Sequence, residues 1–156
     1  MKVSDHMSAK QVFLDAPIRD KEAVLDFVAD AFARCGVAPD KESVHACMKE
    51  REHVMSTGIG GGVGIPHAAC ADVTRPAIVL VRPVTPLDFN ALDTRLVDVI
   101  IAMVVPRNQT SIHLRLLAGI SRLIKTKDFL QAVRSASSPE ALYSRIRKIE
   151  DSMAFH

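Results

Sequence analysis

The sequence of 156 residues predicts an α/β layered domain. Two apolar runs are typical of buried strands: "RPAIVLVRP" (75–83), which is bounded by prolines, and "LVDVIIAMVVP" (96–106), which ends at one. Segments 20–36 and 109–127 repeat apolar residues at helical spacing. Buried strands mixed with amphipathic helices favour a layered α/β architecture. The length and a hydrophobic content of 48% suit a single domain, 1–156, with a sizeable core.

The N-terminal third predicts one strand and two helices. Residues 1–9 are expected to be a flexible N-terminus, and "QVFLDA" (11–16) to be a short strand. The helix over 20–36 is capped by Asp20 and ended by Gly36. A second helix over 39–52 is capped by Asp40 and ends near Arg51 and Glu52. The inward residues of the two helices are Ala23, Val24, Phe27, Val28, Ala31 and Phe32, and then Val44, Cys47 and Met48.

The C-terminal half predicts three helices after the two apolar strands. A turn-rich piece, "VTPLDFNALDTR" (84–95), separates those strands. The apolar face of the helix over 109–127 consists of Ile112, Leu116, Leu117, Ile120, Leu123 and Ile124. Asp128 opens the next helix, and Ser138-Pro139-Glu140 opens the last, because a serine cap and a first-turn proline favour a helix start.

Composition excludes several classes of function. The net charge is only +2 and aromatic residues make up 4%, so no nucleic-acid partner is expected. The start of the chain has no apolar signal-peptide region, and the run at 99–105 is far shorter than the roughly 20 residues of a spanning helix. No membrane insertion is expected. The cysteines Cys35, Cys47 and Cys70 form no CxxC pair, which favours reduced thiols in the cytoplasm.

The segment "STGIGGGVGIPHAAC" (56–70) holds five of the seven glycines. No lysine follows them as in a P-loop, and the dinucleotide pattern GxGxxG fails, so no nucleotide site is predicted. Two interpretations remain: a tight structural connection, or a loop whose clustered amides hold an anion. For an anion, the candidate loop residues are Thr57, Gly58, Gly60 and Pro66. Pro66 would then fix the approach of His67 to the anion.

The six histidines are not equivalent candidates. His6 and His156 are near the termini, while His45 and His53 lie among charged residues and are expected at the surface. His113 extends the apolar face of its helix at the N-terminal end, where the helix dipole favours anions. It is therefore either a core histidine or part of an anion site. Two further alternatives are weak. Zinc held by His67, Cys70 and His113 lacks a fourth ligand, and a hydrolase triad using Ser56 or Thr57 lacks GxSxG and an obvious base.

Three separated motifs, taken together, resemble a known family. They are "RE" (51–52), "STGIGGGVGIPHA" (56–68) and "HLRLLAGIS" (113–121). In order and spacing they are similar to the enzyme IIA domain of the fructose/mannitol class, from the bacterial phosphoenolpyruvate-dependent phosphotransferase system. The resemblance spans about residues 10–150. It implies a three-layer α/β/α sandwich around a small mixed sheet.

The same resemblance implies the roles of three residues and no cofactor. His67 would accept a phosphoryl group from the phosphocarrier HPr or its nitrogen-branch counterpart, His113 would orient and stabilise it, and Arg51 would balance its charge. From the residues alone, an alternative remains, in which Arg51 is a solvated cation at a helix end. The chain departs from the family pattern at Gly64, where alanine is commoner, and at Ala69 and Cys70, near which a basic residue is usual. These departures bear on partner specificity.

Two classes of function fit this resemblance. One is a regulator whose phosphorylation state changes the target protein it binds, favoured because the chain stands alone like nitrogen-branch regulators. The other is a sugar-specific IIA component that passes the phosphoryl group to a IIB domain. A relative that keeps the fold without phosphoryl transfer is a third possibility, against which the set of His67, His113 and Arg51 argues.

Overall fold

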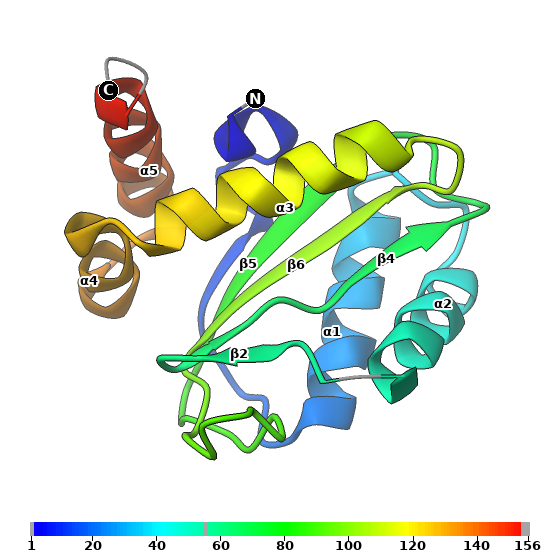
Figure 1. Ribbon diagram of the computed structural model, residues 1–156, viewed down its shortest axis with the longest axis horizontal. Helices are drawn as coiled ribbons and strands as arrows, with labels where there is room; N and C mark the ends of the chain where they lie inside the picture. The colour runs from blue at the N-terminus through cyan, green and yellow to red at the C-terminus, as the bar shows by residue number, and fades with distance from the viewer. Residues whose placement is uncertain (1, 55, 154–156) are drawn as a thin grey trace.

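The protein folds as a mixed β-sheet covered by helices on both faces (Figure 1). The computed structural model describes residues 2–54 and 56–153. The helices are α1 (Lys21–Arg34), α2 (Lys41–Val54), α3 (Thr110–Ile124), α4 (Lys127–Ser135) and α5 (Pro139–Met153), with short 3₁₀ helices η1 (Val3–His6) and η2 (Ala9–Gln11). The strands are β1 (Val12–Ala16), β2 (Gly58–Gly60), β3 (Val63–Gly64), β4 (His67–Cys70), β5 (Ala77–Pro83) and β6 (Val99–Pro106).

The longest strand, β6, organises the sheet. It pairs antiparallel with β5 on one side and parallel with β3 and then β4 on the other. Strand β1 extends the sheet in parallel beyond β5, and β2 pairs antiparallel with β3. Every residue of β6 is buried, as expected for a central strand with helices over both faces.

Alternation along β6 divides the core into two layers. Ile100, Ala102 and Val104 pack with α1 and α2, whereas Ile101 and Met103 pack with α3, α4 and α5. Successive side chains of a strand point to opposite faces, so a fully apolar strand supplies both layers at once. This arrangement confirms the predicted three-layer α/β/α fold.

Most of the predicted elements are present with the predicted caps. The Asp20 and Asp40 carboxylates accept the amide N–H groups of Ala23 and Ser43, and Ser138 Oγ accepts that of Ala141. The start of α4 differs from the prediction by one residue. The helix begins at Lys127 rather than at Asp128, and Thr126 caps it by accepting a hydrogen bond from the amide of Phe129.

The expectation of a flexible N-terminus is wrong for the described residues. The side chain of Val3 is buried, and the amides of Val3 and Ser4 donate to the buried carboxylate of Glu150 in α5 at 2.7 and 2.9 Å. Tyr143 Oη donates to the carbonyl oxygen of Ser4 at 2.9 Å. These bonds fasten η1 against α5, which a sequence reading of a polar, methionine-rich start does not reveal.

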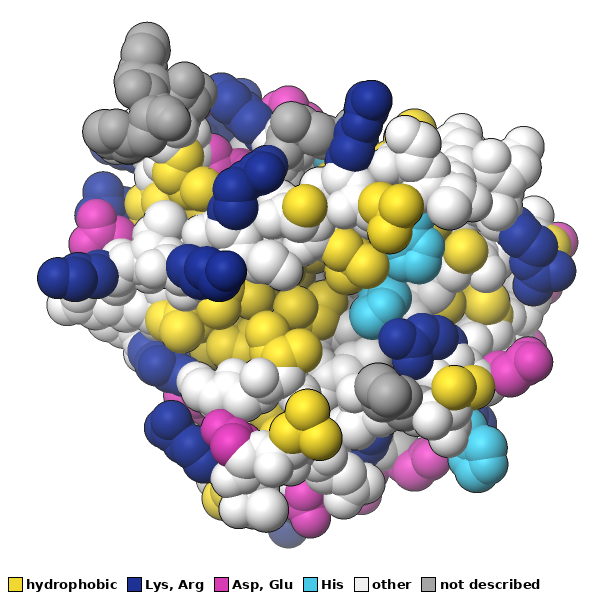
Figure 2. Space-filling model, viewed as in Figure 1, with side chains coloured by type: hydrophobic (Ala, Val, Ile, Leu, Met, Phe, Trp, Pro, Cys, Tyr) yellow, Lys and Arg dark blue, Asp and Glu magenta, His cyan; other side chains and the backbone are white. Residues whose placement is uncertain are grey.

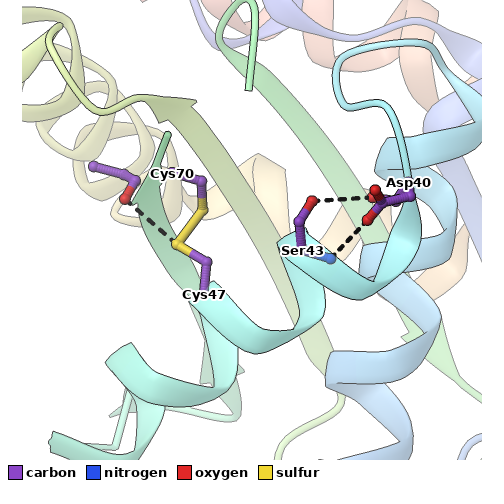
Figure 3. Close-up of a disulfide and its surroundings, with 5 residues drawn as sticks. Asp40, Ser43, Cys47 and Cys70 are labelled. Atoms are coloured by element: carbon purple, nitrogen blue, oxygen red, sulfur yellow. Dashed lines mark hydrogen bonds between the residues drawn. A yellow bond between two sulfur atoms is a disulfide. The ribbon is translucent and has the colours of Figure 1, made fainter. Parts of the chain in front are cut away.

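The prediction of three reduced thiols is also wrong. Cys47 of α2 and Cys70 of β4 form a disulfide, with their Cα atoms 6.1 Å apart (Figure 3). This spacing arises because α2 packs directly on β4, and it lies within the usual range for a disulfide. Cys35 keeps a free thiol. Separately, no helix among residues 2–54 and 56–153 is long and apolar enough to cross a membrane.

Candidate functional site

The glycine-rich segment is a hairpin rather than an open loop. Strands β2 and β3 pair across a turn at Gly61 and Gly62, whose φ angles of +67° and +83° favour glycine. The amide of Thr57 donates to Glu52 and that of Gly58 donates to Ser56 Oγ. Proline has no amide N–H. Of the predicted loop residues Thr57, Gly58, Gly60 and Pro66, the first two already donate their amides within the segment and the last has none, so side chains are the main candidates for anion contacts.

His67 is the first residue of β4, which follows the hairpin of β2 and β3. The carbonyl oxygen of Pro66 accepts the amide of Met103 at 3.0 Å, which fixes the backbone next to His67 against β6. Within β4, Ala68 and Cys70 pack on the α1–α2 side and Ala69 on the α3 side. Alternation therefore places the His67 side chain on the α3 side, with Ala69.

Hydrogen bonding selects one tautomer of His67. Its Nδ1 lies 2.6 Å from the carbonyl oxygen of Ile65, which can only accept, so Nδ1 carries the proton and donates. Nε2 is then left with its lone pair. The Nη2 of Arg51 lies 3.4 Å from this Nε2 and is the donor of that contact. His67 thus presents an unprotonated ring nitrogen to a fixed cation.

His113 completes the group of three predicted residues. It lies in the first turn of α3, and its ring centroid is 5.5 Å from that of His67, with the rings edge to face. Its Nε2 is buried and has no hydrogen-bond partner among the described residues. Figure 2 shows a pair of histidine side chains at the surface, with a basic side chain and hydrophobic side chains around them.

Burial and positive charge keep both imidazoles neutral. Burial is the main cause that lowers the pKa of His67 below its ordinary value of 6.5, and the charge of Arg51 lowers it further. The hydrogen bond to Ile65 and the Glu52 carboxylate act in the opposite direction. Burial is also the main cause that lowers the pKa of His113, and the neighbouring His67 and Arg51 lower it further. Both rings are therefore unprotonated at neutral pH.

Sequence reasoning did not assign a role to Glu52, which supports this site. Its side chain is buried, with one oxygen 2.6 Å from Lys21 Nζ and hydrogen bonds from the amide and hydroxyl of Thr57 at 2.8 and 2.6 Å. Glu52 therefore joins α1, the end of α2 and the start of the hairpin. The signal available in the sequence was a charged residue next to Arg51 with threonine five residues later.

A pocket of about 370 Å³ opens beside the three residues. Arg51, Arg107, His113 and Glu50 line it, together with Cys47 and Ala69. Arg107 follows β6, and its amide donates to the carbonyl oxygen of Cys70. Its side chain adds a second cation that the sequence reading missed, since only the tertiary fold places the end of β6 next to β4. The pocket is thus open, and its two arginines outnumber its one carboxylate, that of Glu50, so its net charge favours an anionic group.

The other predicted alternatives are not assembled around this pocket. Among residues 2–54 and 56–153 no group of three His, Cys, Asp or Glu side chains is arranged to hold a metal ion. Cys70, the only cysteine of the zinc alternative, forms a disulfide with Cys47. Ser56 Oγ donates to the carbonyl oxygen of Phe89, and Thr57 Oγ1 donates to Glu52. His53 lies exposed near the end of α2, as predicted, whereas His45 is half-buried and its Nε2 is buried.

The chain is similar to known proteins over most of its length. Residues 5–149 match the family described as "Phosphoenolpyruvate-dependent sugar phosphotransferase system, EIIA 2". A nitrogen regulatory protein of Pseudomonas aeruginosa is 31% identical over 88% of this chain and 90% of its own length. The fructose-specific EIIA component of Haloferax volcanii is 27% identical over the same shares of the two chains. The crystal structure of nitrogen regulatory protein IIA-Ntr from Neisseria meningitidis superposes with a TM-score of 0.84 at 25% identity, covering 92% of this chain and 98% of that one.

Proposed function

The chain belongs to the EIIA 2 family of the phosphoenolpyruvate-dependent sugar phosphotransferase system, and from this premise we propose that it accepts and passes on a phosphoryl group at Nε2 of His67. Proteins of this family take part in phosphoryl transfer between components of that system. The observation that carries the proposal is the contact of 3.4 Å between Arg51 Nη2 and His67 Nε2, with Nδ1–H held by Ile65. It gives a nucleophile its lone pair and an adjacent positive charge.

Phosphoryl transfer requires positioning and charge stabilisation rather than covalent chemistry by many groups. In the proposed step, a bond forms between His67 Nε2 and phosphorus while the bond from phosphorus to the donor's histidine nitrogen breaks. The Nδ1 proton stays on His67 and keeps its hydrogen bond to the carbonyl oxygen of Ile65. Because the ring gains an electrophile at Nε2, it acquires positive character that this carbonyl oxygen stabilises.

The added group carries close to two negative charges near neutral pH, and the proposed site meets it with donors already in place. Arg51 offers a fork of N–H groups that suits phosphoryl oxygens. His113 lines the same pocket, and its buried Nε2 has no hydrogen-bond partner among the described residues. In the tautomer with its proton on Nε2, His113 would donate a hydrogen bond to those oxygens, a role that the core-histidine interpretation does not give it. Preorganised donors of this kind stabilise developing charge without further rearrangement.

We further propose the donor, the acceptor and the compartment. The donor is a phosphohistidine carrier of the HPr type, acting in the cytoplasm. The match to nitrogen regulatory proteins favours a regulator whose phosphorylation state changes its binding to a target protein. The similarity to the Haloferax volcanii fructose-specific component supports one alternative, transfer to a IIB domain during sugar uptake.

Intact mass measurement tests the acceptor directly. The chain is incubated with phosphoenolpyruvate, enzyme I and an HPr-type carrier, and each component is then omitted in turn. We expect the addition of one phosphoryl group, labile to acid and stable to base as a phosphoramidate is, in the wild type and in the control His53→Ala. The same addition in His67→Ala would disprove the assignment. A purified IIB domain is then added to the phosphorylated chain. Loss of the phosphoryl group to IIB would favour the sugar-uptake alternative, and its retention would favour the regulator.

A further inference from the structure

The disulfide joins the two elements that carry the proposed acceptor and its cation. Cys47 lies in α2 one helical turn before Arg51, so the two residues share a helix face. Cys70 lies in β4 three residues after His67. Figure 3 shows the bond passing from α2 to the strand. The crosslink therefore fixes the distance between α2 and β4 close to where Arg51 meets His67.

The two sulfur atoms differ in access. Cys47 is half-buried and lines the pocket that also holds Arg51 and His113, whereas the side chain of Cys70 is 3% exposed. An incoming thiolate therefore reaches Cys47 first, through a pocket whose arginines favour an anion. Cys47 Sγ also lies 3.4 Å from the carbonyl oxygen of Ala69, so a reduced Cys47 thiol has an acceptor ready.

We propose that the Cys47–Cys70 disulfide is a thiol-exchange site, and that its reduction by a dithiol slows phosphoryl acceptance at His67; this inference rests on the function proposed above. Disulfides in reducing compartments are usually transient and redox-sensing rather than structural. The partner class is a dithiol reductant, either a small molecule or a protein.

The exchange balances in two steps. A thiolate of the dithiol attacks Cys47 Sγ, the Sγ–Sγ bond breaks, and Cys70 leaves as a thiolate that takes up a proton. The second thiol of the reductant then attacks the mixed disulfide and releases Cys47, which also ends as a thiol. Two electrons and two protons pass from the dithiol, which becomes a disulfide. The reverse exchange with an oxidised dithiol restores the crosslink.

Reduction acts on the site through the position of α2. Two thiols require van der Waals separation instead of a covalent bond, so α2 and β4 must move apart where they were tied. Strand β4 is held by its pairing with β6 and Cys70 is buried, so the adjustment falls on α2 and its Arg51. Small displacements of a positioning group are costly in rate. We expect acceptance to slow about threefold to tenfold, since the charge-assisted contact is weakened rather than removed.

Comparison of the two redox forms tests the inference. The chain is prepared oxidised, and reduced with dithiothreitol; alkylation after denaturation counts one free thiol or three in the wild type. Phosphorylation is timed with the HPr-type carrier and with phosphoramidate as a donor that needs no protein docking. Cys35→Ser serves as the control and keeps the full response. Cys47→Ser, whose hydroxyl can donate to the carbonyl oxygen of Ala69, cannot form the disulfide. We expect it to accept the phosphoryl group at the rate of the reduced wild type, with or without dithiothreitol.

A second measurement separates this inference from the function on which it rests. The His67 imidazole is titrated by NMR in both forms, and displacement of the Arg51 charge should raise its pKa on reduction, since that charge lowers it. Equal rates and equal titrations in forms with verified thiol counts would overturn the redox inference alone. A faster reduced form, or a chain that unfolds when reduced, would also overturn it. An absence of labelling in both forms overturns the proposed function and this inference with it.

Discussion

Arg51 Nη2 lies 3.4 Å from His67 Nε2, although one residue belongs to a helix and the other to a strand 16 positions later. The contact forms because α2 packs against β4 and places its last turn beside the first residue of that strand. A cation held at this position lowers the pKa of His67 before any phosphoryl group arrives, and balances the charge of that group afterwards. The charge of Arg51, its geometry and the pH should therefore each have a separate effect on the rate of phosphoryl transfer.

Removal of the Arg51 side chain is expected to affect transfer more than stability. In Arg51→Ala, the phosphorylated state loses a charge-assisted donor, which corresponds to a loss of about tenfold to a hundredfold in rate. Arg51→Lys keeps the charge without the fork of donors and should retain intermediate activity. Rates of phosphorylation and melting temperatures are measured together. Lys49→Ala removes an exposed cation from the same helix and is the control; wild-type rates in Arg51→Ala would remove Arg51 from the site.

His113 is expected to act on the transferred group rather than on folding. His113→Ala should fold normally and accept the phosphoryl group about ten to a hundred times more slowly, because one donor to the charged group is lost. Ser111→Ala, an exposed substitution in the same turn of α3, controls for the helix start. If His113→Ala melts at a much lower temperature while its folded fraction reacts at the wild-type rate, the core-histidine interpretation is correct.

Glu52 is expected to be a positioning residue whose loss is seen first in stability. In Glu52→Gln, Lys21 keeps its charge in a largely buried place without a carboxylate partner, which costs about 3 kcal/mol of the free energy of unfolding. Denaturant unfolding measures that loss. Glu50→Gln, two residues earlier and exposed, should change stability by less than about 0.5 kcal/mol. Equal unfolding of the two variants would show that the Lys21–Glu52 pair does not hold this region together.

The pH dependence follows from the lowered pKa of His67. Its unprotonated ring is the nucleophile, so the rate of acceptance should stay constant above pH 6.5 and fall only as the pH passes through the lowered pKa. The folding stability depends on pH in the same direction. As the pH falls, the unfolded imidazole binds a proton before the folded one does, so the contribution of the neutral ring to stability is present above pH 6.5 and is lost as the pH falls from there through the lowered pKa of the folded state. NMR titration of His67 supplies its pKa. In Arg51→Ala the pKa of His67 should rise, because the charge of Arg51 lowers it. A titration midpoint of His67 above pH 6.5 in the wild type would contradict the lowering of this pKa by burial.

Much of the fold was predictable because its signals are local. Proline-bounded apolar runs predicted β5 and β6, and the spacing of apolar residues with Asp20, Asp40 and Ser138 as caps predicted three helices. Strand β4 was missed because four residues with two alanines carry no periodic signal of their own. The hairpin of β2 and β3 was missed for a related reason: glycine permits many backbone conformations, and pairing with β6 selects one.

The sequence by itself determined the candidates His67, His113 and Arg51, because motif order and residue chemistry are properties of the chain. It could not determine their distances, the tautomer of His67 or the partners of Glu52, since these depend on which elements pack together. The tertiary structure alone decided that Cys47 and Cys70 are bonded. Cysteine spacing along a chain carries no information on Cα separation in space, and that separation is set here by the packing of α2 on β4.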